Sequence, residues 1–151
     1  MSETEWKTLF LALPGEIDLQ QAATETMISH AESQLSIRFH EDLRGALLSA
    51  NGVSDRSNYS SLLWPVEKIV EENLAYRSNS SFRELYMPFD NLLLFADSGN
   101  GDLFAYAIMA DGNAAYRADI FLWDHEPDGR VWFAGRLESY IRNRSVTATS
   151  L

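Results

Sequence analysis

The sequence is most informative at residues 95–106, which read FADSGNGDLFAY. Two apolar runs flank a polar turn in this stretch, and residues 98–101 of the turn tolerate a positive φ. The pattern therefore predicts two antiparallel strands joined by a tight hairpin turn. The turn would bring Asp97 and Asp102 to one end of the hairpin, and neither has a basic neighbour in the sequence.

The second half of the chain repeats this pattern of short apolar runs and turns. We expect strands at residues 62–64, 92–95, 103–108, 120–123 and 131–133. The links between the later strands are short and turn-like, with Asp111-Gly112-Asn113 and Asp128-Gly129 among them. Short links favour antiparallel pairing of neighbouring strands.

The first half of the chain is predicted to be mainly helical. Apolar and small residues at helical spacing predict helices over residues 19–35, 41–50 and 65–77, and a last helix over 135–142. Asp18 is expected to cap the first of these helices, and Asn51-Gly52 to end the second. Residues 6–13 fit either a short helix or an edge element, residues 54–61 are expected to form a loop, and residues 78–81 to end the third helix.

This order of elements predicts an α+β fold. We expect a mostly antiparallel sheet of four to six strands, with N-terminal helices, one mid-chain helix and a C-terminal helix packed on it. The length of 151 residues fits a single domain that spans residues 1–151. Residues 1–18 and the tail 145–151 are expected to be peripheral to it.

The composition limits the chemistry that the chain can perform. Apolar residues make up 46% and charged residues 23%, as in an ordinary globular protein, and there is no cysteine. Disulfides, thiolate metal sites and a cysteine nucleophile are therefore excluded. The start of the chain is acidic rather than basic, and no apolar run approaches membrane length, so we expect a cytoplasmic protein without a membrane partner.

The net charge of −10 restricts the possible partners. A strongly acidic surface repels phosphate backbones, so we expect no nucleic-acid partner. The same charge would speed the encounter with a basic protein. An acidic composition that serves no steering role is the other interpretation, and the sequence leaves both open.

No catalytic or metal-binding motif is found in the chain. Residues 124–129, DHEPDG, and residues 97–102 carry ligand-type side chains, but consecutive residues in a turn point apart, so both are interpreted as turns. There is no Gly-x-Ser-x-Gly elbow, P-loop or dinucleotide fingerprint. Glycoside hydrolysis needs two carboxylates at a defined separation in space, which a sequence does not show, so this possibility stays open. We expect no catalytic residue, no cofactor and no metal.

Aromatic residues are concentrated in the half of the chain that is rich in predicted strands. Most of them are expected to pack in the core. One that is left half exposed beside the acidic turns would make a good anchor for a partner protein. Trp123 is the candidate, because Asp124 follows it at the end of a predicted strand.

Several short motifs follow one another along the chain in a recognisable order. They read ISHAESQL at residues 28–35, FHEDLR at 39–44, LLSANG at 47–52, LLWPVEKI at 62–69, FAD at 95–97, GDLFAY at 101–106 and IFLWDHE at 120–126. This order, over residues 24–141, resembles the SUKH superfamily, which includes a fungal cell-wall-synthesis regulator and many bacterial immunity proteins.

The resemblance implies an α+β fold without intrinsic catalysis. It also implies a role as the immunity partner, or antitoxin, of a bacterial toxin that is often a nuclease. A toxin of that kind carries basic residues that an acidic protein can cover. The candidate contact residues are Asp97, Asp102, Trp123, Asp124 and Glu126. The alternatives are a regulatory or scaffolding module that binds cellular proteins, and an uncharacterised hydrolase.

Overall fold

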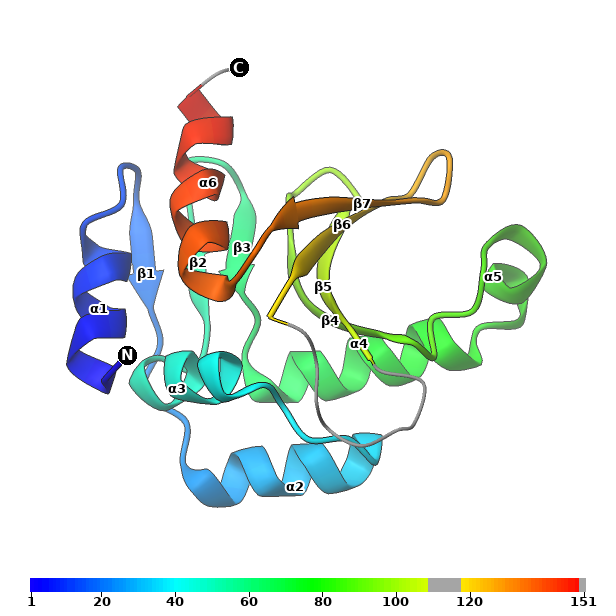
Figure 1. Cartoon of the computed structure of the whole chain (residues 1–151), viewed down its shortest axis with the longest axis horizontal. Coiled ribbons are helices and arrows are strands. Elements are labelled where there is room, and N and C mark those ends of the chain that lie inside the picture. Colours follow the sequence, from blue (N-terminus) through cyan, green and yellow to red (C-terminus); the bar gives the residue numbers. More distant parts are fainter. Residues whose placement is uncertain (109–117, 150–151) are drawn as a thin grey trace.

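The computed structural model describes residues 1–108 and 118–149 (Figure 1). The turn expected at Asp111-Gly112-Asn113 lies outside these residues. No helix in the described part of the chain is both long and apolar enough to span a membrane.

The sheet is an antiparallel meander in which each strand pairs with the next strand along the chain. Its strands are β1 (Ile17–Leu19), β2 (Val53–Asp55), β3 (Ser60–Leu63), β4 (Leu92–Asp97), β5 (Leu103–Ala107), β6 (Ile120–Asp124) and β7 (Gly129–Ala134). The predicted α+β class is confirmed, but the seven strands exceed the expected four to six. The loop predicted over residues 54–61 was wrong, because it contains most of β2 and the start of β3.

The helices are α1 (Glu3–Leu11), α2 (Glu25–Leu35), α3 (Glu41–Ser49), α4 (Val66–Ser78), α5 (Ser80–Leu85) and α6 (Leu137–Thr149). The open choice at residues 6–13 is resolved as the helix α1. The predicted start of a helix at residue 19 was wrong, because Thr24 caps α2 by accepting a hydrogen bond from the Met27 amide at 3.2 Å. Asp18 lies in β1 instead, where it pairs with Arg56 at 3.0 Å.

Of two further helix ends, one agrees with the prediction and one does not. Residues 78–81 were expected to end a helix, and α4 does end at Ser78. Asn79 then starts α5 at once, because its side chain accepts hydrogen bonds from the amides of Ser81 and Phe82. The last helix continues past residue 142 to Thr149.

The two faces of the sheet are covered by different helices. Leu103 and Phe104 are consecutive in β5 and therefore point to opposite faces. Leu103 pairs with Trp123, whose ring packs edge-on against Tyr76 of α4 at 5.8 Å. The Phe104 ring lies 5.0 Å from that of Tyr140 in α6. Helices α4 and α6 therefore pack on opposite faces.

Asn73 fixes α4 to the sheet. It is buried, its amide group donates to the Leu94 carbonyl at 2.8 Å, and its side-chain oxygen accepts from the Leu94 amide at 2.9 Å. Both backbone groups of one residue of β4 are thus paired by a helix side chain. This arrangement satisfies polar groups that burial would otherwise penalise.

Helix α1 contributes to the same core as the sheet. Trp6, Leu9 and Phe10 are buried, so part of the segment that was expected to be peripheral packs in the interior. Gly45 of α3 makes room for this packing, since a Cβ atom there would lie 2.9 Å from Nε1 of Trp6. Figure 1 shows α1 beside β1 at one side of the molecule and α5 at the opposite side.

Candidate functional site

Three turns meet at one end of the sheet, and we call residues 56–59, 98–102 and 125–128 the turn face. In the turn between β4 and β5, the Ser98 amide donates to the Asp102 carbonyl at 3.1 Å. Gly99 and Gly101 both have positive φ, 89° and 104°. The tight hairpin predicted from the sequence is therefore confirmed.

The turn between β2 and β3 lies directly against the first one. A Cβ atom at Gly99 would lie 2.7 Å from the Tyr59 carbonyl oxygen, so only glycine permits this approach. Tyr59 has φ of 52°, and it is 89% exposed. Exposed aromatic side chains are typical anchors in protein interfaces. Tyr59 therefore has the exposure that was expected of an anchor residue.

The turn between β6 and β7 contacts the hairpin through His125. Its Nδ1 lies 2.6 Å from Oδ1 of Asp102, and the same oxygen accepts the His125 amide at 3.2 Å. Gly101 permits this contact because it has no side chain. A Cβ atom there would lie 2.9 Å from the His125 ring. The hydrogen bond to Asp102, helped by nearby Glu126 and Asp124, raises the pKa of His125 above its ordinary value.

Asp102, Asp124 and His125 are the described residues that could hold a metal ion at this end. One ligand atom from each lies within 4.8 Å of the others. The sequence predicted separate turns at residues 97–102 and 124–129. The fold brings Asp102 of the first together with Asp124 and His125 of the second. The atoms already hydrogen-bond with one another or with the backbone, so the arrangement is satisfied as it stands.

Asp97 lies just beneath the turn face and is hydrogen-bonded within the protein. Its Oδ1 accepts from the Ser61 amide at 3.2 Å, and its Oδ2 accepts from Nε1 of Trp64 at 2.7 Å. Lys68 lies 3.9 Å from Oδ2. Asp97 therefore joins β3 and the start of α4 to β4.

Trp123 also lies beneath the turn face, and the expectation that it would be a half-exposed anchor was wrong, because it is only 2% exposed. Its ring packs edge-on against Tyr86 and Phe89, and its Nε1 donates to Oδ1 of Asp128 at 2.8 Å. The structure thus brings all five predicted contact residues to one end of the sheet. Of these, Glu126 is exposed, and Asp102 and Asp124 are partly exposed.

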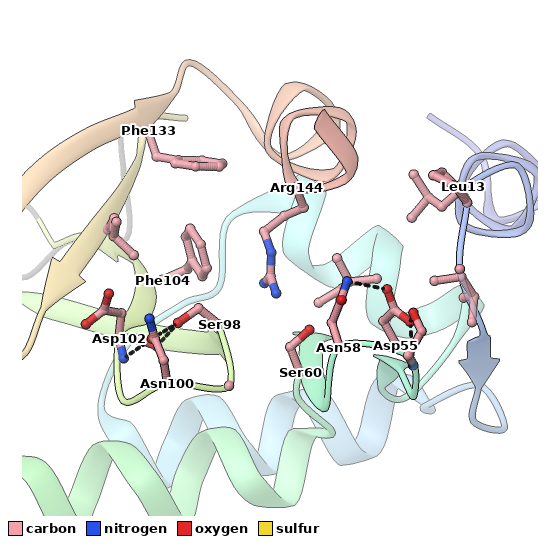
Figure 2. A pocket seen from close by; sticks show the side chains of 17 residues that line it. Leu13, Asp55, Asn58, Ser60, Ser98, Asn100, Asp102, Phe104, Phe133 and Arg144 are labelled. Atoms are coloured by element: carbon pink, nitrogen blue, oxygen red, sulfur yellow. Dashed lines mark hydrogen bonds between the residues drawn. The ribbon is translucent and has the colours of Figure 1, made fainter. Parts of the chain in front are cut away.

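A groove of about 660 Å³ begins at the turn face and runs along the sheet (Figure 2). One wall is apolar and comes from the sheet, with Phe104, Leu122 and Phe133. The opposite wall is formed by Leu13 and Pro14 of the segment before β1 and by Ile17 at the start of β1. The polar floor is formed by residues of two turns, Asp55, Ser57, Asn58, Ser60, Ser98, Gly99, Asn100 and Asp102.

Asp55 is buried at the floor of this groove. Burial opposes its charge, but hydrogen bonds from Ser57, from the Glu16 amide and from Asn58 outweigh burial and lower its pKa. Nδ2 of Asn58 donates to Oδ2 of Asp55 at 3.0 Å. Asp55 is therefore an ionised carboxylate whose donors come from its own turn and from the Glu16 amide before β1.

Arg144 reaches the groove from α6, and Figure 2 shows its side chain pointing between Phe104 and Asn58. The guanidinium lies 4.6 Å from the centre of the Phe104 ring, and its Nη1 donates to Oη of Tyr140 at 2.9 Å. Burial raises the pKa of Tyr140 to about 12, so its phenol stays protonated and donates to the Leu62 carbonyl at 2.7 Å.

The sequence analysis missed Asp55, Tyr59, Asp128 and Arg144. The signal for Asp55 was present in the sequence Asp-x-Ser-Asn. In this pattern the aspartate side chain typically accepts hydrogen bonds from the turn residues that follow it. Arg144 carried no such signal. It approaches the groove only because α6 extends beyond the predicted end at residue 142.

These features define an α+β domain with an antiparallel meander, a polar turn face and an adjoining groove. A family model described as SMI1-KNR4 cell-wall, SUKH_6, matches residues 25–141. The chain therefore belongs to the SUKH superfamily, as its motifs indicated. A comparison with curated proteins found no match.

Proposed function

We propose that this chain is a non-enzymatic binding protein that neutralises a basic, nuclease-type toxin by covering it with the turn face. The observation that carries the proposal is the meeting of three turns at one end of the sheet. Asp102, Asp124 and Glu126 gather there beside the exposed ring of Tyr59. An aromatic anchor next to a negative rim suits a basic partner.

Two further observations support binding rather than catalysis. Of the two carboxylates that line the groove, Asp55 accepts hydrogen bonds from its own turn and Asp102 pairs with His125. The pKa of Asp55 is lowered, which makes it a poor general acid at neutral pH. Membership of a superfamily that includes immunity proteins points in the same direction.

In this arrangement the five predicted contact residues have two kinds of role. Glu126, Asp124 and Asp102 face the toxin, and their charge speeds its approach. Asp97 and Trp123 support the turns from beneath, since their polar atoms are bonded to Trp64 and Asp128.

The test is rescue of a heterologous host that expresses a toxin domain encoded beside this chain. We expect the chain to restore growth and to bind the toxin with an association rate that falls as salt rises. The double variant Asp124→Asn/Glu126→Gln should slow association severalfold. The Asn side chain still accepts the hydrogen bond that Asp124 now takes from the residue-126 amide at 3.1 Å.

The matched control removes two exposed charges elsewhere, in Glu41→Gln/Glu71→Gln on α3 and α4. This control should leave the association rate almost unchanged. Equal slowing by both pairs, or failure of the chain to rescue growth from any neighbouring toxin, would overturn the proposal. Capture of host regulatory proteins in place of a toxin would also overturn it.

A further inference from the structure

We propose that the groove receives an acidic side chain of the bound partner, flanked by apolar residues, and that Arg144 is the group that holds its carboxylate. The inference rests on the proposed function, because the occupant is a segment of the protein that covers the turn face. It adds a positively charged recognition point inside the groove, next to the acids of the turn face.

Arg144 has donors to spare. Both of its hydrogen bonds within the described part of the chain come from Nη1, to the Ser61 carbonyl at 3.3 Å and to Oη of Tyr140 at 2.9 Å. No ion pair within 4.0 Å among the described residues includes it. A guanidinium has five N–H groups in a planar fork, so Nε and Nη2 can still donate to a carboxylate.

The guanidinium is also held in place before any ligand arrives. It lies 4.6 Å from the Phe104 ring centre and 5.8 Å from that of Tyr140. Cation–π stacking on two rings and two hydrogen bonds restrict its rotamers. Less conformational entropy is then lost when a ligand binds.

The carboxylates of the groove already accept hydrogen bonds on the chain, whereas two nitrogens of the Arg144 guanidinium have no acceptor among the described residues. Asp55 accepts from Ser57, Asn58 and the Glu16 amide, and Asp102 pairs with His125. The charged group of the groove that keeps unused hydrogen-bonding capacity is therefore the guanidinium, in a chain of net charge −10. Charge complementarity favours an anionic group at this point, and the fork geometry suits a carboxylate.

The groove and the turn face are continuous, which identifies the source of the carboxylate. Asn58, Gly99, Asn100 and Asp102 belong to both. A volume of about 660 Å³ holds a few side chains, and apolar walls on both sides suit aliphatic neighbours of the acid. A partner seated on the turn face can extend a segment into the groove without leaving the surface.

The experiment is a titration of the full chain with capped tripeptides, followed through backbone amide signals by NMR. The probes are acetyl-Leu-Glu-Leu-amide, the matching Gln and Lys peptides, and 4-methylpentanoate as a free acid. We expect the Glu peptide to shift signals of groove residues at millimolar concentration. The Gln peptide should bind about tenfold more weakly, as loss of a charge-assisted hydrogen bond requires.

Arg144→Gln should abolish the preference for Glu over Gln, and Arg144→Lys should keep part of it because the charge remains. Arg136→Gln, which removes an exposed arginine from the segment just before α6, is the matched control and should leave the preference intact. The amide spectrum of each variant reports whether it is folded.

Three outcomes would overturn the inference. They are equal binding of the Glu and Gln peptides, shifts that map outside the groove, and binding of the free acid as tight as that of the Glu peptide. The titration needs no toxin, so its failure is distinct from failure of the rescue assay.

Discussion

The carboxylates at and beneath the turn face differ in what they bond to. Asp97 and Asp128 accept the indole N–H groups of Trp64 and Trp123 at 2.7 and 2.8 Å. Glu126 is exposed, and its side chain has no hydrogen bond or ion pair with the described part of the chain. Residue type alone gave Asp97 and Glu126 the same expected role, because a sequence does not show which acid lies beneath a turn and which lies on it.

This difference predicts that removing Asp97 lowers the stability of the fold, whereas removing Glu126 leaves it almost unchanged. Asp97→Ala would leave the Trp64 indole and the Ser61 amide without their acceptor, at a cost of about 1–3 kcal/mol for each buried donor. Glu126→Ala is the control and should stay within about 0.5 kcal/mol of the parent, as exposed substitutions do. Urea unfolding of the two variants measures both effects, and equal stability would contradict the supporting role of Asp97.

The pairing of His125 with Asp102 predicts a titration that can be measured directly. The hydrogen bond from Asp102 raises the pKa of His125 above its value of 6.5 in unfolded chains. The pairing therefore stabilises the fold below pH 6.5, and the contribution is lost as the pH rises through the folded-state pKa. NMR titration of the imidazole protons should give the raised pKa.

Asp102→Asn should return the His125 pKa toward its ordinary value, because the neutral amide no longer favours the imidazolium. His30, which lies exposed on α2, serves as an internal reference in the same spectra. A His125 pKa that is the same in both proteins would show that the pairing does not persist in solution.

At the scale of elements, predictability followed length and pattern. The strands around residues 95 and 104 and the helices that start near residues 41 and 65 could be predicted, because each has a long apolar pattern and a clear end signal. β1 and β2 were missed because each has three residues, too few for alternation to be recognised. These two strands form because they pair with a neighbouring strand, and a local sequence pattern does not show such pairing.

The contact between the hairpin turns predicts a specific cost at Gly99. Gly99→Ala would place a Cβ atom 2.7 Å from the Tyr59 carbonyl oxygen, at a φ of 89° that L residues rarely adopt. We expect a loss of about 1–3 kcal/mol in the free energy of unfolding. It should be accompanied by shifts in the amide signals of residues 56–59, since that turn must move away.

Gly129→Ala is the matched control, because Gly129 lies in β7 and its nearest neighbour would be 3.7 Å from the added Cβ atom. It should leave the free energy of unfolding unchanged within about 0.5 kcal/mol. If Gly99→Ala is as stable as this control, the two turns do not touch in solution as described.

At the scale of the whole molecule, the groove depends on elements from both ends of the chain. Its walls come from β1 and the segment before it, from the sheet and from α6, so it forms only when these parts are docked. The sequence predicted the α+β class and placed Asp97 and Asp102 at one end of a hairpin. It could not predict the groove, because no local pattern encodes that residues 13 and 144 line the same groove.

The prediction that the chain folds as a single domain can be tested through Trp6. Trp6 of α1 is 1% exposed, and it belongs to the same core cluster as Trp123 at the other side of the sheet. In one cooperative unit, Trp6→Ala should lower the free energy of unfolding by about 3–5 kcal/mol, the usual cost of removing a buried tryptophan. The distant indole N–H signal of Trp123 should then disappear at a correspondingly lower urea concentration. If the midpoint for Trp123 stays at its parent value while the signals of α1 are lost early, α1 is a separate folding unit and the groove can lose one wall while the sheet remains folded.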